Sequence, residues 1–247
     1  MRDGQPPGQP PGQAADQIAV ALRRRITAGE LPPGTALRDA ALAQVFGASR
    51  NTIREALRAL RYDGLVDHQV NRGAVVRTLT PADVRDIYAA RRALELSAIQ
   101  DSGVAVESAL ADVGRAVERA EQAVAARTWQ DVGTASLGFH HALVALLASP
   151  SLNAFFAGVV ARLRLAFAVM DDEASFQSPW VPRDRQIWEL LSAGRREDAA
   201  AHLGIYLDDS ERMVLDVVRG AAHRPAAGRR GRTPRPRTTD RTSIEWT

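Results

Sequence analysis

Apolar residues recur at helical spacing in three segments of the first third of the chain. The first segment begins near Asp16 and ends at Gly29, and the second runs from Asp39 to Gly47. The third follows Ser49, a residue type that caps helix N-termini. Its apolar positions are spaced i, i+3, i+4 and i+7, which is the pattern of one buried helix face. These positions are Ile53, Ala56, Leu57 and Leu60.

Two short strand-like runs follow, at 65–68 and 74–77. Asn71, Arg72 and Gly73 lie between them and have the composition of a tight turn. A hairpin directly after three helices is the pattern of a winged helix-turn-helix, with the turn at the tip of the wing.

Every segment from Thr80 to about Arg219 has a helical pattern. Thr80 is a predicted N-cap, and Pro81 takes the first helical position, where proline is favoured. Six amphipathic stretches with short joins predict an antiparallel bundle. The predicted fold class is therefore mainly α, with an N-terminal winged helix-turn-helix followed by a helical bundle.

These patterns predict four segments. Residues 14–79 form the winged helix-turn-helix and residues 80–222 the helical domain. Residues 1–13 are Pro/Gly/Gln-rich and residues 223–247 are Arg/Pro/Thr/Gly-rich. Both ends are predicted to be disordered tails.

Charge divides the chain in the same way. All 32 basic residues are arginine, and the net charge is +3. Residues 14–79 carry 10 arginines against 6 acids, and residues 80–222 carry 14 against 20. A basic head on an acidic body indicates that the head meets a polyanion.

Composition excludes several classes of protein. The chain has no cysteine, which rules out disulfides, thiolate metal sites and cysteine nucleophiles. No apolar run reaches the roughly 18 residues that span a bilayer, and the first residues lack the apolar stretch of a secretory signal. A cytoplasmic protein with no membrane partner is expected.

The predicted third helix has a basic face opposite its apolar face. Arg50, Arg54, Arg58 and Arg61 recur on it at steps of four, four and three. The first turns of a recognition helix reach base edges in the major groove, where arginine binds guanine. For Arg58 and Arg61 a solvated charged face is an equal alternative.

Shorter polar groups complete the expected DNA surface. Ser49 and Thr52 can hold phosphate at the helix N-terminus, and Asn51 can pair with adenine. The turn at Asn71, Arg72 and Gly73 can lie along the DNA backbone or minor groove. The alternative is an ordinary hairpin turn.

The run from 28 to 76 contains the elements Pro33-Gly34, Leu37, Leu42-Ala43, Gly47, Ser49-Arg50, Arg54-Glu55-Ala56-Leu57, Gly64-Leu65 and Asn71-Arg72-Gly73. With these elements at this spacing, the run resembles the DNA-binding domain of the GntR family. The resemblance implies DNA-binding roles for Ser49, Arg50, Asn51, Thr52, Arg54 and Gly73. Some members place a DNA-contacting arginine where this chain has Ala40, and Arg38 is the candidate to replace it.

The second region contains Tyr88, Arg91, Leu94-Glu95, Phe139-His140, Asn153 and the stretch from Ile187 to Leu207. With these residues it resembles the C-terminal domain of the FadR subfamily. It implies six or seven helices around a small-molecule pocket, in a domain that also builds a homodimer.

Many members of that subfamily hold a divalent metal on one aspartate and three histidines. The corresponding positions here are Ser136, His140, Asp184 and Tyr206. Three of the four differ, so no cofactor is expected, and His140 and Asp184 are weak metal candidates.

The same positions predict a polar pocket without the family. Arg91, Ser136, His140 and Asp184 fall on the apolar stripes of three helices. Inward polar groups are costly to bury unless they pair or meet a ligand. Arg91 would bind a carboxylate; alternatively it forms a structural salt bridge with Asp184 or a helix-end carboxylate. Tyr206 completes the candidate effector-binding set.

The sequence thus predicts a DNA-binding regulator that is not an enzyme. The expected form is a homodimeric repressor of a palindromic operator, modulated by a small acidic metabolite. A ligand-independent or activating regulator is the alternative. A hydrolase using Ser136, His140 and Asp184 is remote because no nucleophile elbow is present. A protein that coats nucleic acid through its arginine-rich tail is a further rival.

Overall fold

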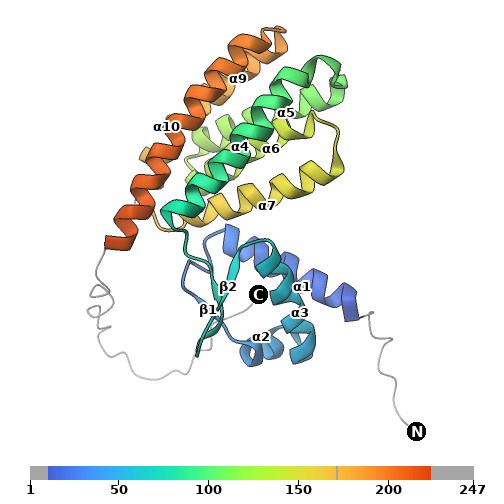
Figure 1. Cartoon of the computed structure of the whole chain (residues 1–247), viewed down its shortest axis with the longest axis vertical. Coiled ribbons are helices and arrows are strands. Elements are labelled where there is room, and N and C mark those ends of the chain that lie inside the picture. The colour runs from blue at the N-terminus through green and yellow to red at the C-terminus, as the bar shows by residue number, and fades with distance from the viewer. Residues whose placement is uncertain (1–10, 171, 224–247) are drawn as a thin grey trace.

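The computed structural model describes residues 11–170 and 172–223. Within them the chain forms ten α-helices, one 3-10 helix and three short strands (Figure 1). The elements are α1 (Pro11–Thr27), β1 (Ala36–Leu37), α2 (Asp39–Phe46), α3 (Arg50–Tyr62), β2 (Val66–Gln69), β3 (Gly73–Val76), α4 (Pro81–Asp101), η1 (Ser102–Val104), α5 (Glu107–Ala126), α6 (Trp129–Ala145), α7 (Pro150–Phe167), α8 (Glu173–Gln177), α9 (Val181–Ser192) and α10 (Arg196–His223).

The predicted tails fall almost wholly outside the described residues. Where the two overlap, the structure is helical: α1 begins at Pro11 rather than near Asp16, and α10 continues to His223 rather than ending near Arg219. The predictions for the rest of the two tails lie outside the described part of the chain.

The N-terminal head is a winged helix-turn-helix, as predicted. Gly47 ends α2 in the left-handed conformation at φ 60°. Ser49 then caps α3 by accepting a hydrogen bond from the backbone N–H of Thr52 at 3.1 Å. Both features follow from local sequence, because glycine tolerates positive φ and serine binds the free N–H groups of a first turn.

The wing is a three-stranded antiparallel sheet in the order β1-β3-β2. Val66 pairs with Val76, and Gln69 pairs with Gly73 at the tip. The hairpin was predicted, but β1 was not, and Ala36 pairs with Val75 across a long sequence separation. Asn71 and Gly73 both have positive φ, which the tight turn requires.

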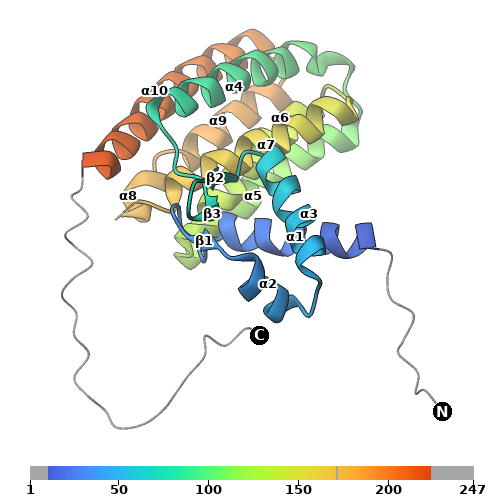
Figure 2. The same ribbon diagram turned by 60° about the horizontal axis from the view of Figure 1, so that its bottom comes forward.

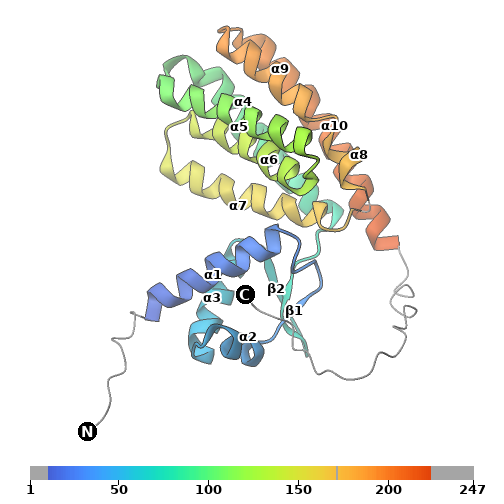
Figure 3. The ribbon, with the colours of Figure 1, turned by 180° about the vertical axis from the view of Figure 1, so that it is seen from behind.

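Seven helices, α4 to α10, form the second domain and confirm the predicted bundle (Figure 2). A capping box of Thr80 and Asp83 begins α4 after a short connector from the wing. The long α10 lies along α4, and α5 lies along α6 (Figures 1 and 3). The short α8 was not predicted. Val106 and Phe155 are apolar but exposed.

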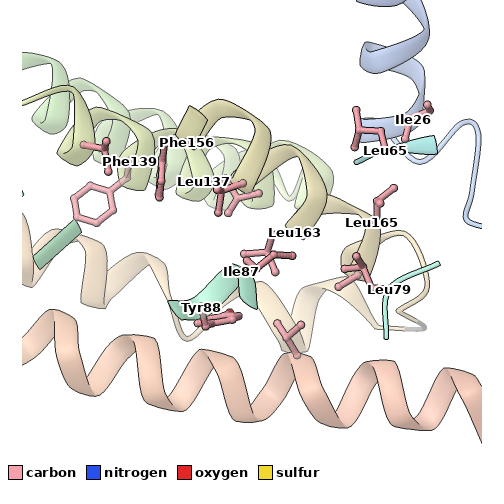
Figure 4. Close-up of a cluster of buried hydrophobic side chains, with 14 of the residues drawn as sticks. Ile26, Leu65, Leu79, Ile87, Tyr88, Leu137, Phe139, Phe156, Leu163 and Leu165 are labelled. Carbon is pink, nitrogen blue, oxygen red and sulfur yellow. The ribbon is translucent and has the colours of Figure 1, made fainter. Parts of the chain in front are cut away.

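A single buried apolar cluster joins head and bundle. Ile26 of α1 and Leu65 of the head lie on one side, and Leu79, Ile87 and Leu165 on the other (Figure 4). The head is therefore packed against the bundle as well as tethered to it. No helix in the described ranges is long and apolar enough to cross a membrane.

Candidate DNA interface and sensor pocket

The polar face of α3 is exposed along its length. Arg50, Arg54, Arg58 and Arg61 all lie at the surface, and none makes an ion pair with another described residue. The opposite face buries the four predicted apolar residues. Unpaired surface guanidinium groups are available to bind an anionic partner without first breaking a protein contact.

The short polar side chains at the start of α3 have defined roles in the fold. The Ser49 hydroxyl lies 2.8 Å from that of Thr52 and also caps the helix. The Asn51 amide donates a hydrogen bond to Glu55 at 3.0 Å. Arg38 is exposed at the N-cap position of α2, where it makes no side-chain capping bond.

A groove of about 410 Å³ lies between α3 and the wing. Arg54, Arg58 and Arg61 line one wall, and His68 and Gly73 line the other. Sequence reasoning assigned no role to His68 and left Arg58 and Arg61 open. The groove places His68 of the wing beside these arginines, together with the carboxylates of Asp39 and Asp67. Strand pairing creates this arrangement, and helical periodicity alone does not reveal it.

The wing tip is anchored to the rest of the head. Arg72 donates hydrogen bonds to the side chain of Gln69 and to the carbonyl of Gly34, each at 3.2 Å. Asn71 is exposed beside it. Arg72 thus holds the turn against the loop before β1.

The predicted inward-facing polar residues of the bundle are all buried. Arg91 comes from α4, Ser136 and His140 from α6, Asp184 from α9 and Tyr206 from α10. Each has a relative exposure of 5% or less. Their roles therefore depend on which of them form hydrogen bonds or ion pairs with one another.

Glu95 organises one side of this cluster. Its carboxylate accepts a hydrogen bond from Nε of Arg91 at 2.8 Å and lies 2.6 Å from Nδ1 of His140. As an alternative to ligand binding, the sequence predicted a structural salt bridge of Arg91 with Asp184 or with a helix-end carboxylate. Arg91 does form a structural salt bridge, but neither of these is its partner. The partner is a mid-helix glutamate one turn along α4, in an i,i+4 ion pair with both members buried.

Ser136 joins the other side of the cluster. Its hydroxyl donates a hydrogen bond to Asp184 at 2.9 Å and lies 3.5 Å from the Tyr206 hydroxyl. A serine hydrolase needs the histidine between serine and carboxylate. Here Ser136 bonds the carboxylate directly and His140 bonds Glu95, so this arrangement does not form the nucleophile–base pair of the rival hydrolase.

Burial sets the protonation of these groups. It raises the pKa of Asp184 well above its ordinary value, against the hydrogen bond from Ser136, and it also raises the pKa of Tyr206. Burial lowers the pKa of His140, and Glu95 only partly opposes this. Burial alone would raise the pKa of Glu95, but Arg91 and His140 reverse the direction. The cluster is close to neutral overall, with one ion pair inside it.

Three polar atoms of the cluster have no hydrogen-bond partner. They are Nη2 of Arg91, Nε2 of His140 and Oδ1 of Asp184. A cavity of about 20 Å³ adjoins Arg91 and His140, with Gln177 and Tyr206 also in its wall. That space suffices for a water molecule, so a larger ligand requires the walls to move.

The donor set does not fit the metal site of related domains. His140 Nε2 and Asp184 Oδ1 are 3.9 Å apart, but the other two positions are hydroxyls. No group of three or more His, Cys, Asp and Glu in the described ranges could hold a metal ion.

Sequence reasoning did not place Glu95, Tyr88, Gln177 or Ser210 in the site, although the last three line the cavity. The available signal for Glu95 was its position four residues after Arg91. Gln177 belongs to the unpredicted α8 and carried no such signal.

A winged-helix head with unpaired arginines on its third helix, joined to an all-helical second domain, is the architecture of a class of DNA-binding transcription regulators. The sequence profile described as "Bacterial regulatory proteins, gntR family" matches residues 14–76, and the FCD domain matches residues 86–209. The chain therefore belongs to the GntR family of transcription regulators, and its FCD domain fits the FadR subfamily.

Individual relatives agree with this assignment. YdhC, an HTH-type transcriptional regulator of Bacillus subtilis (strain 168), is 39% identical over 32% of this chain and 35% of its own length. The gluconate operon transcriptional repressor of Bacillus licheniformis is 30% identical over 52% of this chain and 53% of its own length. These matches thus span only about a third to a half of those proteins.

A solved structure matches over a longer stretch. A protein described as a transcriptional regulator GntR from Rhodococcus sp. RHA1 is 34% identical, with a TM-score of 0.78. The match covers 83% of this chain and 98% of that one. Together the matches indicate a DNA-binding transcription regulator rather than an enzyme.

Proposed function

We propose that this regulator represses transcription by binding a palindromic operator as a homodimer. The observation that carries the proposal is the exposed, unpaired arginine face of the capped helix α3. A two-fold dimer would place two such helices in successive major grooves of a palindrome. Relatives named as repressors support this polarity. The proposal implies a cytoplasmic location, since the operator lies in the chromosome.

The DNA-contacting set we propose keeps the residues predicted from sequence and adds the groove. Arg50, Asn51 and Arg54 would read bases, while Ser49 and Thr52 would hold phosphate. Arg38, Asn71, Arg72 and Gly73 would contact the DNA from α2 and the wing. In this proposal residues 14–79 are the DNA-binding unit and residues 80–222 the effector-binding and dimerisation unit.

We further propose that a small carboxylate metabolite enters the polar cluster. The unpartnered Nη2 of Arg91 is a donor for a carboxylate, and His140 Nε2 and Asp184 Oδ1 can bond further polar atoms. Ser136 and Tyr206 lie within the same network. Binding would release DNA only if the ligand favours an arrangement of the heads that does not bind it.

A ligand-independent regulator is the second candidate, and one observation favours it. The cavity holds about 20 Å³, and Arg91 is already neutralised by Glu95. In that case the cluster is a structural network that fixes the packing of α4, α6 and α9. The two candidates differ in whether any small acid stabilises the folded domain.

The DNA proposal is tested by selecting duplexes from a random pool with the full chain. We expect one palindromic motif to be enriched, and Arg50→Ala or Arg54→Ala to weaken its binding by about 1–3 kcal/mol. Arg119→Ala, an exposed arginine of α5 in the bundle, is the matched control. Equal binding by all three variants would refute the assignment.

The effector proposal is tested by thermal unfolding against a panel of small mono- and dicarboxylates. A true ligand at 100 times its Kd should stabilise the protein by about 2.7 kcal/mol. Arg91→Met should abolish that shift. If no acid shifts unfolding and the selected duplex is still bound, the ligand-independent candidate is favoured.

A further inference from the structure

Helix α1 of the head ends against the bundle, and side chains of the bundle bind its last carbonyl groups. Nε of Arg164 on α7 donates a hydrogen bond to the carbonyl of Thr27 at 3.0 Å. The side-chain amide of Gln130 donates to the carbonyl of Ala28. The last carbonyls of a helix have no partner within it, so these bonds from another domain satisfy groups that would otherwise need water.

Arg164 is built into the bundle as well as the head. Its side chain is 7% exposed, Nη2 donates to the carbonyl of Gln130 at 3.3 Å, and its guanidinium stacks over the ring of Phe167. Burial lowers its pKa, while Glu173 and Asp131 oppose this. A charge held in this way has few alternative positions, so displacing it must move what it binds.

The same guanidinium lies near Gln177, which belongs to the wall of the cavity of about 20 Å³ beside Arg91 and His140. This cavity is called the sensor cavity below. Nη1 of Arg164 and the amide nitrogen of Gln177 both lie against the Cα of Gly133, each 2.6 Å from where a Cβ would stand. Gln177 is 1% exposed and lines the cavity together with Phe167. The two side chains thus share one small space that only a glycine leaves open.

Neither of the two nitrogens has a hydrogen-bond partner, although Nη1 of Arg164 lies 3.8 Å from a carboxylate oxygen of Glu173 in an ion pair. A half-turn of the Gln177 amide would present its oxygen to that space in place of its nitrogen, since the two ends of the amide have nearly the same shape. The orientation of this one amide therefore decides whether Nη1 of Arg164 has, in addition to the Glu173 carboxylate, a donor or an acceptor of Gln177 beside it.

We propose that Gln177 and Arg164 couple the sensor cavity to the DNA-binding head. A polar ligand in the cavity that bonds the Gln177 amide sets its orientation, which shifts Arg164 and loosens or tightens its hold on the end of α1. Because α1 packs on α3 through one buried cluster, the recognition helix moves with it. Through this coupling, ligand binding in the cavity would change the position of the DNA-binding head. The regulatory role of the coupling rests on the proposed function.

A hydrogen-exchange double-mutant cycle on the full chain tests the coupling without a ligand or DNA. The reporters are the amides of Ala28, Gly29 and Leu31, which bond the last carbonyls of α1. We expect Gln177→Ala to change their exchange by at least about fivefold. In the Arg164→Met background the same change should have less than about a twofold effect.

Arg162→Met is the matched control. Arg162 lies two residues earlier on α7, and the aliphatic part of its side chain packs against Gly64 of the head. Its Nη1 lies 3.5 Å from a carboxylate oxygen of Asp86. Arg162 does not line the cavity. In this background the effect of Gln177→Ala should be retained. If Arg164→Met does not fold, Arg164→Lys replaces it, with the same expectation because lysine lacks the planar fork.

Two results would overturn the coupling. One is no effect of Gln177→Ala on the three amides of the otherwise natural chain. The other is an equal effect with and without Arg164. Both are read independently of DNA, so failure to select any duplex would refute the proposed function and leave this result intact.

Discussion

The carboxylate of Glu95 lies 2.6 Å from Nδ1 of His140, and both side chains are almost completely buried. A histidine bonded in this way donates from Nδ1 and leaves Nε2 as an acceptor. Glu95 thereby fixes the orientation and tautomer of His140 while it also neutralises Arg91. One residue outside the predicted site determines the state of two residues within it.

Removing the charge of Glu95 should destabilise the bundle. Glu95→Gln keeps the shape of the side chain but leaves the Arg91 guanidinium buried without its counter-charge, so we expect a loss of about 3–5 kcal/mol in the free energy of unfolding. Chemical denaturation measures it. Asp198→Asn breaks the exposed pair with Arg195 and should cost less than about 1 kcal/mol. Similar losses in both variants would mean that the Arg91 pair is effectively solvated.

Asp184 should make stability depend on pH. Its folded pKa is raised above the ordinary 3.8, so its contribution is complete below 3.8 and is lost as the pH rises toward the folded pKa. An asparagine at this position cannot ionise, and in Asp184→Asn the amide oxygen can still accept the hydrogen bond from the Ser136 hydroxyl. The variant should therefore gain stability relative to the natural chain as the pH rises from 3.8, by up to about 1.4 kcal/mol per pH unit.

Unfolding free energies of the two proteins over a pH series provide the measurement. Because His140 and Glu95 titrate in both, their contributions largely cancel in the difference. A difference that stays flat across the series would show that Asp184 ionises in the folded state as it does in the unfolded chain.

Arg58 lies in the groove between α3 and the wing, where a phosphate contact is the expected role. Arg58→Ala should weaken binding to all duplexes by a similar factor. It should also reduce the slope of log K against log salt by about 1, because one fewer counterion is released. Salt titrations with the selected duplex and a scrambled one measure this. An unchanged slope would assign Arg58 to a solvated face.

Gly133 and Gly138 lie on the same helix but in different surroundings. A Cβ at Gly133 would lie 2.6 Å from Arg164 and from Gln177, whereas a Cβ at Gly138 meets nothing within 4 Å. Gly138→Ala should stabilise the protein by up to about 1 kcal/mol through helix propensity. Gly133→Ala should instead destabilise it by about 1–3 kcal/mol through overpacking. Thermal unfolding distinguishes the two variants. Equal stabilisation by both would show that the Arg164 side chain moves away from the new methyl group without a cost in free energy.

Local signals in the sequence predicted much of the fold. The Ser49 cap, the Gly47 turn and the Thr80-Pro81 start each depend on bonds within a few residues, and the structure confirms all three. Strand β1 escaped prediction because it is two residues long and exists only through pairing with β3. Phe155 is exposed next to the buried Phe156 on α7, which shows that apolar spacing does not reveal whether another element covers a helix face.

The candidate site was less predictable for a similar reason. Burial of His140 and Asp184 followed from their place on apolar stripes. Glu95 did not stand out because an i,i+4 pair has the same sequence pattern on a surface as in a core. The role of Arg164 could not be read from sequence because its partner is a backbone carbonyl 137 positions away.

Besides the apolar packing and the contact of Arg162 with Gly64, the head is attached to the bundle at two places. One is the covalent connector between β3 and α4, and the other is the set of hydrogen bonds to the end of α1 at Thr27 and Ala28. These two attachments define a line, and rotation about that line is the motion of the head that breaks neither of them. While both attachments hold, such a rotation moves the recognition helix along one arc. Releasing the second attachment changes that hinge into a pivot, so the two heads of a dimer would lose their fixed separation without any change in the heads themselves.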